Sequence, residues 1–352
     1  MNEREIDRAR IARTIQALSD RVAGLRPETA LHHILERKLE REAQQWTPRS
    51  LKTACVLQGG AMRGVASAGA IIALEQLGFT EAFDAVYGAS AGAINGAYFL
   101  AGQAAFGTSI YYQDIANRRF INPARLWKIV DMDFLFQEII ARRKRLDLDR
   151  VRQNRTPLHI IATEVQTGRE VLFSSHDHEL DLLAALKASA ALPILYPYPV
   201  RVGERLYVDG GVVDAIPIER ALLDGCTDLL VVLTVPKTHR AKPPSALERM
   251  LAARLLRPLS RDLERAFLHR HETYNRALDL ALGRRDAPAN IVALFLDPQL
   301  PLSRLTKDVS VLKRAATQTG RLIFQLFAGE DRESVELLHF VKRPHRGPAE
   351  SR

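Results

Sequence analysis

From residue 51 onwards, short apolar runs alternate with longer stretches whose apolar residues recur at helical spacing. Residues 53–57 form a short apolar run, and residues 65–77 follow it as a helical stretch. A second strand-like run at 83–87 precedes an Ala-rich helical stretch at 93–102. This order predicts a βαβ unit, in which the two strands lie parallel in one sheet.

The alternation continues along the chain and predicts an α/β fold. Residues 108–145 have a helical pattern with Trp127 and Phe134 on its apolar side, and this stretch is a candidate cap over a site. A hairpin is expected around residues 166–169, where Gly168 suits the turn. The remaining predicted strands are 157–165, 170–174, 205–208, 229–235 and 291–296, and the remaining predicted helices are 180–190, 246–282 and 308–327.

These patterns divide the chain into three parts. Residues 1–50 are charged, with apolar positions such as Leu31 and Leu35 at helical spacing, and predict an N-terminal helical extension. Residues 51–330 predict one α/β domain, in which residues 236–285 form a helical insertion or linker. Residues 331–352 predict a polar C-terminal tail.

Composition restricts the class of protein. With 352 residues and 47% hydrophobic content the chain can bury a substantial core, which excludes disorder as its main state. Cys55 and Cys226 lie in or beside apolar runs, so a disulfide is not expected and a reducing compartment fits. The first eight residues lack the apolar core of a secretory signal, and the weakly polar residues 85–107 are too rich in Gly and Ala for a membrane span. We therefore expect a cytoplasmic protein.

The net charge of +9 suits an anionic partner, for which a lipid surface is the candidate and nucleic acid is not expected. Many basic residues alternate with acidic ones, as in residues 36–42, which is typical of a solvated helix face with paired charges. Residues 142–145 are four consecutive basic residues without an acidic residue among them. This run is the candidate for a peripheral contact with an anionic membrane.

The sequence Gly88-Ala89-Ser90-Ala91-Gly92 lies between the second predicted strand and its helix. A serine at such a turn takes a strained backbone conformation, and small residues two places on either side let strand and helix approach. The helix that follows directs unpaired N–H groups and its positive dipole end towards the serine. Ser90 is therefore the candidate nucleophile, with Gly88 and Gly92 in support.

A Gly-rich loop, Gln58-Gly59-Gly60-Ala61-Met62-Arg63-Gly64, joins the first predicted strand to its helix. Its backbone N–H groups are placed to form an oxyanion hole above Ser90. A dinucleotide-binding loop is the competing interpretation, but its G-x-G-x-x-G spacing is not matched. Arg63 either binds a phosphate headgroup or anchors its own loop.

A third motif, Asp209-Gly210-Gly211, follows the strand predicted at 205–208. In parallel sheets, ligand chemistry gathers at the carboxyl ends of strands, and Gln58, Ser90 and Asp209 all fall at or just past predicted strand ends. Asp209 is therefore the candidate base. The alternative is a turn former, because Asp-Gly is ordinary turn chemistry.

Together these motifs resemble the patatin-like phospholipase family of serine lipid acyl hydrolases. The loop at 58–64, the G-x-S-x-G elbow at 88–92 and the Asp-Gly-Gly motif at 209–211 carry the resemblance, and residues 188–193 with Tyr196 and Pro197 add a softer match. The resemblance implies a three-layer fold, with a mainly parallel central sheet flanked by helices, over residues 51–330.

The resemblance also implies a Ser90–Asp209 dyad that hydrolyses phospholipids or other acyl lipids, as a phospholipase A or lysophospholipase. The N–H groups of Gly59, Gly60 and Ala61 would form the oxyanion hole, with Arg63, Gly88, Gly92, Gly210 and Gly211 in support. Neither a cofactor nor a metal is implied. His176 and His178 flank Asp177 without a third metal ligand, and His159 is expected to be structural.

Three positions depart from the family pattern. Gln58 replaces the usual acid and Ala61 the usual third glycine, and a positive φ at Ala61 would cost on the order of 1 kcal/mol. Asp214 stands where Asn is frequent, either supporting its loop or raising the basicity of Asp209.

Two other functions remain open. The first is a Ser-His-Asp α/β-hydrolase esterase, with His269, His271 or His339 as its base. The second is a catalytically inert lipid-surface module.

Overall fold

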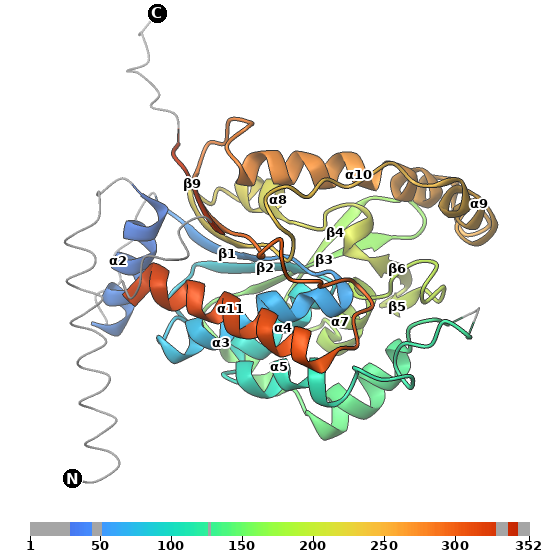
Figure 1. Ribbon diagram of the computed structural model, residues 1–352, viewed down its shortest axis with the longest axis horizontal. Coiled ribbons are helices and arrows are strands. Elements are labelled where there is room, and N and C mark those ends of the chain that lie inside the picture. Colours follow the sequence, from blue (N-terminus) through green and yellow to red (C-terminus); the bar gives the residue numbers. More distant parts are fainter. Residues whose placement is uncertain (1–28, 44–50, 126–127, 329–336, 344–352) are drawn as a thin grey trace, which may run out of the picture.

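The computed structural model describes residues 29–43, 51–125, 128–328 and 337–343. Within these residues a nine-stranded sheet runs in the order β5-β6-β3-β2-β1-β7-β8-β9, with β4 paired to β3 (Figure 1). The strands are β1 (Thr53–Leu57), β2 (Ala85–Ala89), β3 (Leu158–Glu164), β4 (Glu170–Ser174), β5 (Val200–Val202), β6 (Arg205–Asp209), β7 (Asp228–Val232), β8 (Asn290–Leu294) and β9 (Leu338–Val341).

The five central strands, β3, β2, β1, β7 and β8, run parallel. These strands are short and mostly apolar, as expected where both faces of a sheet are covered, and β1, β2, β7 and β8 are buried along their whole length. The outer strands β4, β5, β6 and β9 pair antiparallel. The predicted βαβ unit corresponds to β1, α3 and β2.

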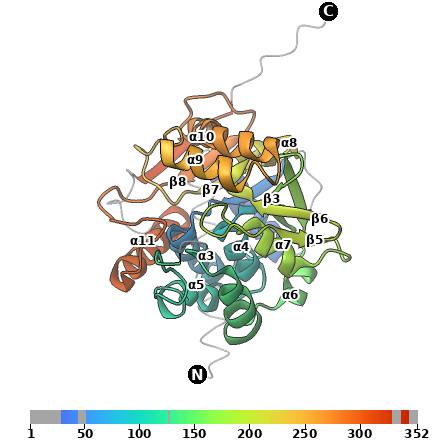
Figure 2. The same cartoon turned by 90° about the vertical axis from the view of Figure 1, so that its right-hand side faces the viewer.

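Helices cover both faces of the sheet and make three layers (Figures 1 and 2). On one face lie α8 and α10, and on the other lie α3, α4, α5, α7 and α11. The helices described are α2 (Ala30–Glu42), η1 (Ala61–Gly64), α3 (Val65–Gln76), α4 (Ala91–Leu100), α5 (Ala104–Gln113), η2 (Phe134–Arg143), α6 (Leu148–Gln153), α7 (Leu182–Ser189), η3 (Gly210–Val212), α8 (Ile218–Leu223), α9 (Ala246–Leu255), α10 (Arg261–Ala281) and α11 (Val309–Ala328).

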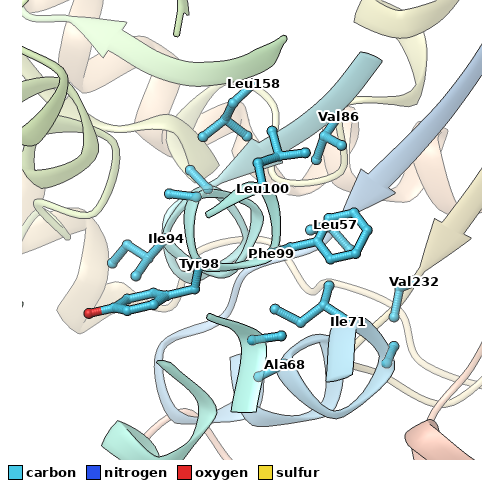
Figure 3. Packing of buried hydrophobic residues seen from close by; sticks show 14 of the residues in the cluster. Leu57, Ala68, Ile71, Val86, Ile94, Tyr98, Phe99, Leu100, Leu158 and Val232 are labelled. Atoms are coloured by element: carbon cyan, nitrogen blue, oxygen red, sulfur yellow. The ribbon is translucent and has the colours of Figure 1, made fainter. Parts of the chain in front are cut away.

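Alternate residues of the central strands enter two hydrophobic cores. Leu57 of β1 and Val86 of β2 pack against α3 and α4, where they meet Ile71 and Phe99 (Figure 3). Val56 of β1 points to the other face, towards the core beneath α8 and α10. Burying a side chain of this size contributes about 1.5–3 kcal/mol. The period-two burial fixes the register, and with it the positions of the strand ends that carry the site.

The described part of the predicted N-terminal extension packs onto the domain. Leu31, Ile34 and Leu35 of α2 are at most 2% exposed. On the same helix, His33 contacts Asp228 at 2.7 Å. The helical spacing predicted the helix, but the apolar stripe docks on the sheet and does not stand apart from it. Residues 1–28 and 44–50 lie outside the described residues.

Three further segments differ from their predictions. The predicted basic helix at 246–282 is divided at Pro258 into α9 and α10, where the Ser260 hydroxyl caps the second helix. In the predicted helical cap at 108–145, helix is found in α5 and η2. The described residues between them, 114–125 and 128–133, are mostly irregular, and Trp127 lies outside the described residues. Residues 338–341, in the predicted polar tail, form β9, which pairs antiparallel with β8 at the edge of the sheet. The domain boundaries themselves stay a prediction.

In the part of the chain that the structure describes, none of the helices combines the length and the apolar character needed to cross a bilayer.

Candidate active site

Ser90 occupies the turn between β2 and α4, with φ 56° and ψ −130°. A positive φ at a non-Gly residue costs about 1–3 kcal/mol and persists only where the surroundings enforce it. Here Ser189 enforces it: its hydroxyl accepts from the Ser90 N–H at 2.9 Å and donates to the Ile161 carbonyl at 2.6 Å. The strained turn is therefore fastened to α7 and β3.

The glycines that flank the serine allow backbones to approach closely. A Cβ on Gly92 would lie 2.1 Å from the Leu57 carbonyl oxygen, and one on Gly88 would lie 2.6 Å from the Ala93 nitrogen. Neither position can hold a larger residue without moving β1 or α4. Both glycines thus place Ser90 next to the end of β1, where the Gly-rich loop begins.

Asp209 lines the same cleft as Ser90, but its strand runs in the opposite direction to the central strands. Its strand β6 runs antiparallel to β3, which corrects the expectation that Asp209 ends a parallel strand. The register still brings it to the serine, because Asp209 pairs with Ala162 of β3, and the neighbouring Ile161 pairs with Ala89 of β2. The Asp209 N–H also donates to the Ala191 carbonyl at 3.0 Å.

The segment 189–191 thus holds both candidate residues, Ser90 through a hydroxyl and Asp209 through a carbonyl. The softer motif at 188–193 contained this segment, but the residues alone gave no reason for its importance. Ser189 is a positioning residue that sequence reasoning did not single out.

The Asp209 carboxyl is 2% exposed, and this burial raises its pKa to about 6. The Ser90 side chain and the Gly211 N–H, which donates to Oδ1 at 2.6 Å, oppose the shift. Oδ2 is buried and has no well-directed hydrogen-bond partner among the described residues. One carboxylate oxygen is therefore held in place and the other remains available to take a proton.

The loop Gly59, Gly60 and Ala61 runs directly beside Ser90. A Cβ on Gly59 would lie 3.0 Å from the Ser90 Cβ, so only glycine fits this approach. The three N–H groups make no hydrogen bond within the described residues. Gly60 has φ 130° and Ala61 has φ 53°. Ala61 therefore does adopt the left-handed conformation that an alanine disfavours.

Gln58 anchors the start of this loop. Its Oε1 accepts from the Thr234 N–H at 2.7 Å, and its Nε2 donates to the Tyr274 hydroxyl at 2.6 Å. Thr234 also donates to the Gly59 carbonyl at 2.8 Å. The oxygen and the nitrogen of this neutral amide thus tie the loop to the segment that follows β7 and to α10.

A second anchor is a buried polar network on the side of α4. Asn95 donates to the Gly64 carbonyl at 2.8 Å and to the Ser67 hydroxyl at 3.0 Å, and it accepts from the Tyr111 hydroxyl at 3.1 Å. Ser67 donates to the Gln58 carbonyl at 3.1 Å. Sequence reasoning missed this network, since a lone Asn in an apolar helix carries no signal of its partners.

Two cavities open at Ser90. The apolar pocket, about 50 Å³, is lined by residues of α4 and α5 together with Phe120, Val130, Met132 and Leu135. The polar cleft, about 790 Å³, is lined by the Gly-rich loop, Asp209, residues 239–242, α10 and residues 302–304. Ser90 lines both, and Asp209 lines the polar cleft. The predicted cap at 108–145 therefore contributes the walls of the apolar pocket.

Arg63 lines the polar cleft, and its guanidinium lies against the Tyr274 hydroxyl. Gly210 and Gly211 begin η3 beside Asp209, and a Cβ on Gly210 would lie 2.2 Å from the Ile161 carbonyl oxygen. Asp214 accepts from the Ile216 N–H at 3.2 Å and so supports its own loop. Burial, with Glu170 and Glu219 nearby, raises the pKa of Asp214 to about 8.

Of the histidines considered as a base, His271 lines the polar cleft, whereas His269 and His339 do not. In the described residues no histidine is hydrogen-bonded to Ser90 or Asp209. His159 stacks on Tyr87 with ring centroids 4.7 Å apart, as a structural residue would. The described residues contain no cluster of His, Cys, Asp and Glu that could hold a metal ion.

Comparison with known proteins agrees with the motifs. Residues 55–222, which include the Gly-rich loop, Ser90 and Asp209, match the family model described as patatin-like phospholipase, and the predicted resemblance is thereby confirmed. The uncharacterized protein YjjU of Escherichia coli (strain K12) is 27% identical over 285 residues, which cover 78% of this chain and 77% of that protein.

Two solved structures align over 84% of this chain. VipD from Legionella pneumophila does so with 12% identity and a TM-score of 0.44, over 69% of its own chain. The type III effector protein ExoU does so with 16% identity and a TM-score of 0.34, over 56% of its own chain.

Proposed function

Because residues 55–222 match the patatin-like phospholipase family, we propose that this chain is a serine lipid acyl hydrolase, of phospholipase A or lysophospholipase type. The observation that carries the proposal is the meeting of Ser90 and Asp209 in one cleft, beside three N–H groups without hydrogen-bond partners in the described residues. A nucleophile, a base and oxyanion donors are what ester hydrolysis by serine requires.

In the proposed mechanism Asp209 accepts the Ser90 hydroxyl proton as Oγ attacks the ester carbonyl carbon. The negative charge on the carbonyl oxygen is stabilised by the N–H groups of Gly59, Gly60 and Ala61. The ester C–O bond then breaks, and the leaving alcohol takes the proton from Asp209. A water molecule, deprotonated by Asp209, attacks the acyl-Ser90 ester, and the proton returns to Ser90 as the fatty acid leaves.

A carboxylate is a weak base for a serine hydroxyl, so its surroundings must help. Burial raises the pKa of Asp209 to about 6, which makes it a stronger base while leaving it mostly ionised at neutral pH. The N–H groups add to this, because they need no reorganisation when charge develops. The apolar pocket suits an acyl chain, and the polar cleft suits the remainder of the lipid.

A Ser-His-Asp esterase is the second candidate, because His271 lines the same cleft as Ser90. Substitution separates the two mechanisms. With a dyad, Asp209→Asn abolishes hydrolysis of a soluble ester such as 4-nitrophenyl butyrate, while His271→Ala, His269→Ala and His339→Ala retain it. Hydrolysis that survives Asp209→Asn but is lost in His271→Ala would establish the triad instead.

The function itself is tested by labelling and by product identification. A fluorophosphonate probe should label the wild type and leave Ser90→Ala unlabelled. Incubation with a mixed lipid extract should release fatty acids, identified by mass spectrometry, with the wild type and not with Ser90→Ala. Absence of both labelling and acyl release in correctly folded wild type would leave the inert lipid-surface module as the better description.

A further inference from the structure

Resting on the proposed function, we propose that the polar cleft is a headgroup subsite that selects acyl lipids bearing a net-negative phosphate, above all a phosphate monoester. Five cationic side chains line the cleft and only two carboxylates face them among the described residues. The cations are Arg63, Arg240, Lys242, Arg270 and Arg304, and the carboxylates are Asp209 and Glu248.

Two of these cationic residues lie at the oxyanion loop. Arg63 belongs to the loop itself, and Arg304 belongs to the neighbouring segment 302–304. The Arg63 guanidinium folds back over Gly60, where an added Cβ would lie 3.1 Å from its Nε. The carbonyl of Arg304 accepts from the Met62 N–H at 3.2 Å, which holds the segment 302–304 against the same loop. An anion between them would lie close to the reacting carbonyl, as the phosphate of a glycerophosphate ester does.

Much of this positive charge has no acidic partner. Arg270 pairs with Glu248, and Arg240 pairs with Asp279 at 2.5 Å. Arg63, Lys242 and Arg304 form no ion pair within the described residues, which distinguishes them from the paired charges on the solvated helix faces. A bound phosphate would supply the missing charge with several acceptor oxygens.

Three residues of the same cleft carry buried nitrogen atoms without partners. Nε of Arg63 and Nη1 of Arg240 are buried N–H donors without hydrogen-bond partners in the described residues, and Nδ1 of His271, whose role depends on the tautomer, has no partner there either. Because these atoms are buried, a ligand in the cleft reaches them only when the side chains shift. A buried donor without a partner costs about 1–3 kcal/mol, which a ligand that accepts from it after such a shift regains. All three residues line the polar cleft.

The cations also repel one another. Burial and the charge of Arg304 lower the pKa of Arg63, and the pKa of Arg270 is lowered by burial and by Arg304 as well. Burial lowers the pKa of His239, and Arg63, Arg304 and Arg240 add to that shift. Gln58, at the start of the loop, is uncharged and therefore does not offset the repulsion between these cations. An anion in the cleft converts these unfavourable interactions into favourable ones.

The first experiment compares substrates that differ only in headgroup. Octanoyl-glycerol 3-phosphate and octanoyl-glycerophosphocholine are used below their aggregation concentrations, so that no lipid surface contributes. The wild type should show at least a tenfold higher kcat/KM for the phosphate monoester. Arg304→Gln with Lys242→Gln should reduce this ratio about tenfold, whereas Arg321→Gln, an exposed charge on α11, should leave it unchanged.

The second experiment measures binding without catalysis. An octyl ether of glycerol 3-phosphate, which cannot be hydrolysed, should bind Ser90→Ala at least tenfold more tightly than its phosphocholine counterpart, and Arg304→Gln in that background should remove the difference. Competition by inorganic phosphate separates recognition of the phosphate alone from recognition of the whole headgroup.

The outcomes distinguish the two proposals. Equal binding of the two ethers, or a kcat/KM ratio near one in the wild type, overturns the headgroup subsite and leaves the hydrolase proposal standing. Selective binding of the phosphate ether without hydrolysis of any ester overturns the hydrolase proposal and leaves an anionic-lipid site. Competition by inorganic phosphate that is as strong as by the phosphate ether would mean that the cleft binds free phosphate and does not select a lipid.

Discussion

At the scale of single residues, Asp209 should set the pH dependence of catalysis. Its pKa is raised by burial to about 6, and only its ionised form can take a proton from Ser90. We expect kcat/KM for 4-nitrophenyl butyrate to rise through pH 6 as one group deprotonates and to level above pH 7. A rate that does not change between pH 5 and pH 7 would contradict the assignment of Asp209 as the base.

The same shift makes a prediction about stability. Between the unfolded value of 3.8 and about 6, the folded protein binds the proton that the unfolded chain has lost, so the free energy of unfolding should fall as pH rises through this window. The loss amounts to about 3 kcal/mol. Asp209→Asn should remove this pH dependence and be inactive, and denaturant unfolding at pH 4 and pH 8 checks it against the wild type.

Ala61 provides a second prediction at this scale. Its φ of 53° is strained for alanine, so Ala61→Gly should stabilise the protein by about 0.5–1 kcal/mol after the extra entropy of glycine in the unfolded chain is counted. The matched control is Ala266→Gly, within helix α10, which should instead cost about 1 kcal/mol. Denaturant unfolding measures both, and a loss of stability in Ala61→Gly would contradict the strain.

The candidate catalytic residues could be proposed from sequence, and the residues that hold them in place could not. Ser90 and Asp209 lie in local motifs whose spacing indicates chemistry. Ser189 and Asn95 act through hydrogen bonds to groups 16 to 99 positions away in the chain, which no local pattern encodes. The sequence alone raised the question of a positive φ at Ala61, because the family pattern has glycine at this position.

At the scale of elements, the central parallel strands could be predicted from their short apolar runs. The direction of β6 did not follow, because a five-residue strand of mixed polarity fits either direction and its pairing with β3 decides it. β9 and the docking of α2 were missed for a related reason. The charged composition of α2 predicted solvent exposure, but a few apolar positions on one face bury it, whereas β9 stays partly exposed and is held by its pairing with β8.

The element that lines the apolar pocket allows a prediction about acyl chain length. Leu135, in η2, is 6% exposed and faces a pocket of about 50 Å³. Leu135→Ala should lengthen the pocket and raise the ratio of kcat/KM for 4-nitrophenyl octanoate over the butyrate severalfold, at a cost of about 2–5 kcal/mol in stability. The control is Leu263→Ala, a buried leucine of α10 that does not line the pocket, which should cost similar stability without changing the ratio.

At the scale of the whole molecule, an excess of nine positive charges predicts electrostatic attraction to anionic lipid. Ser90→Ala protein, which should not hydrolyse the lipid, is sedimented with vesicles of phosphatidylcholine containing about one fifth phosphatidylserine. Binding should fall steeply as salt rises from 0.05 to 0.5 M, because the Debye length shrinks from roughly 14 Å to about 4 Å over that range. Vesicles of phosphatidylcholine alone should bind less at every salt concentration. Binding that is indifferent to both salt and lipid charge would mean that the excess charge serves solubility, and that any selectivity for anionic lipid resides in the polar cleft.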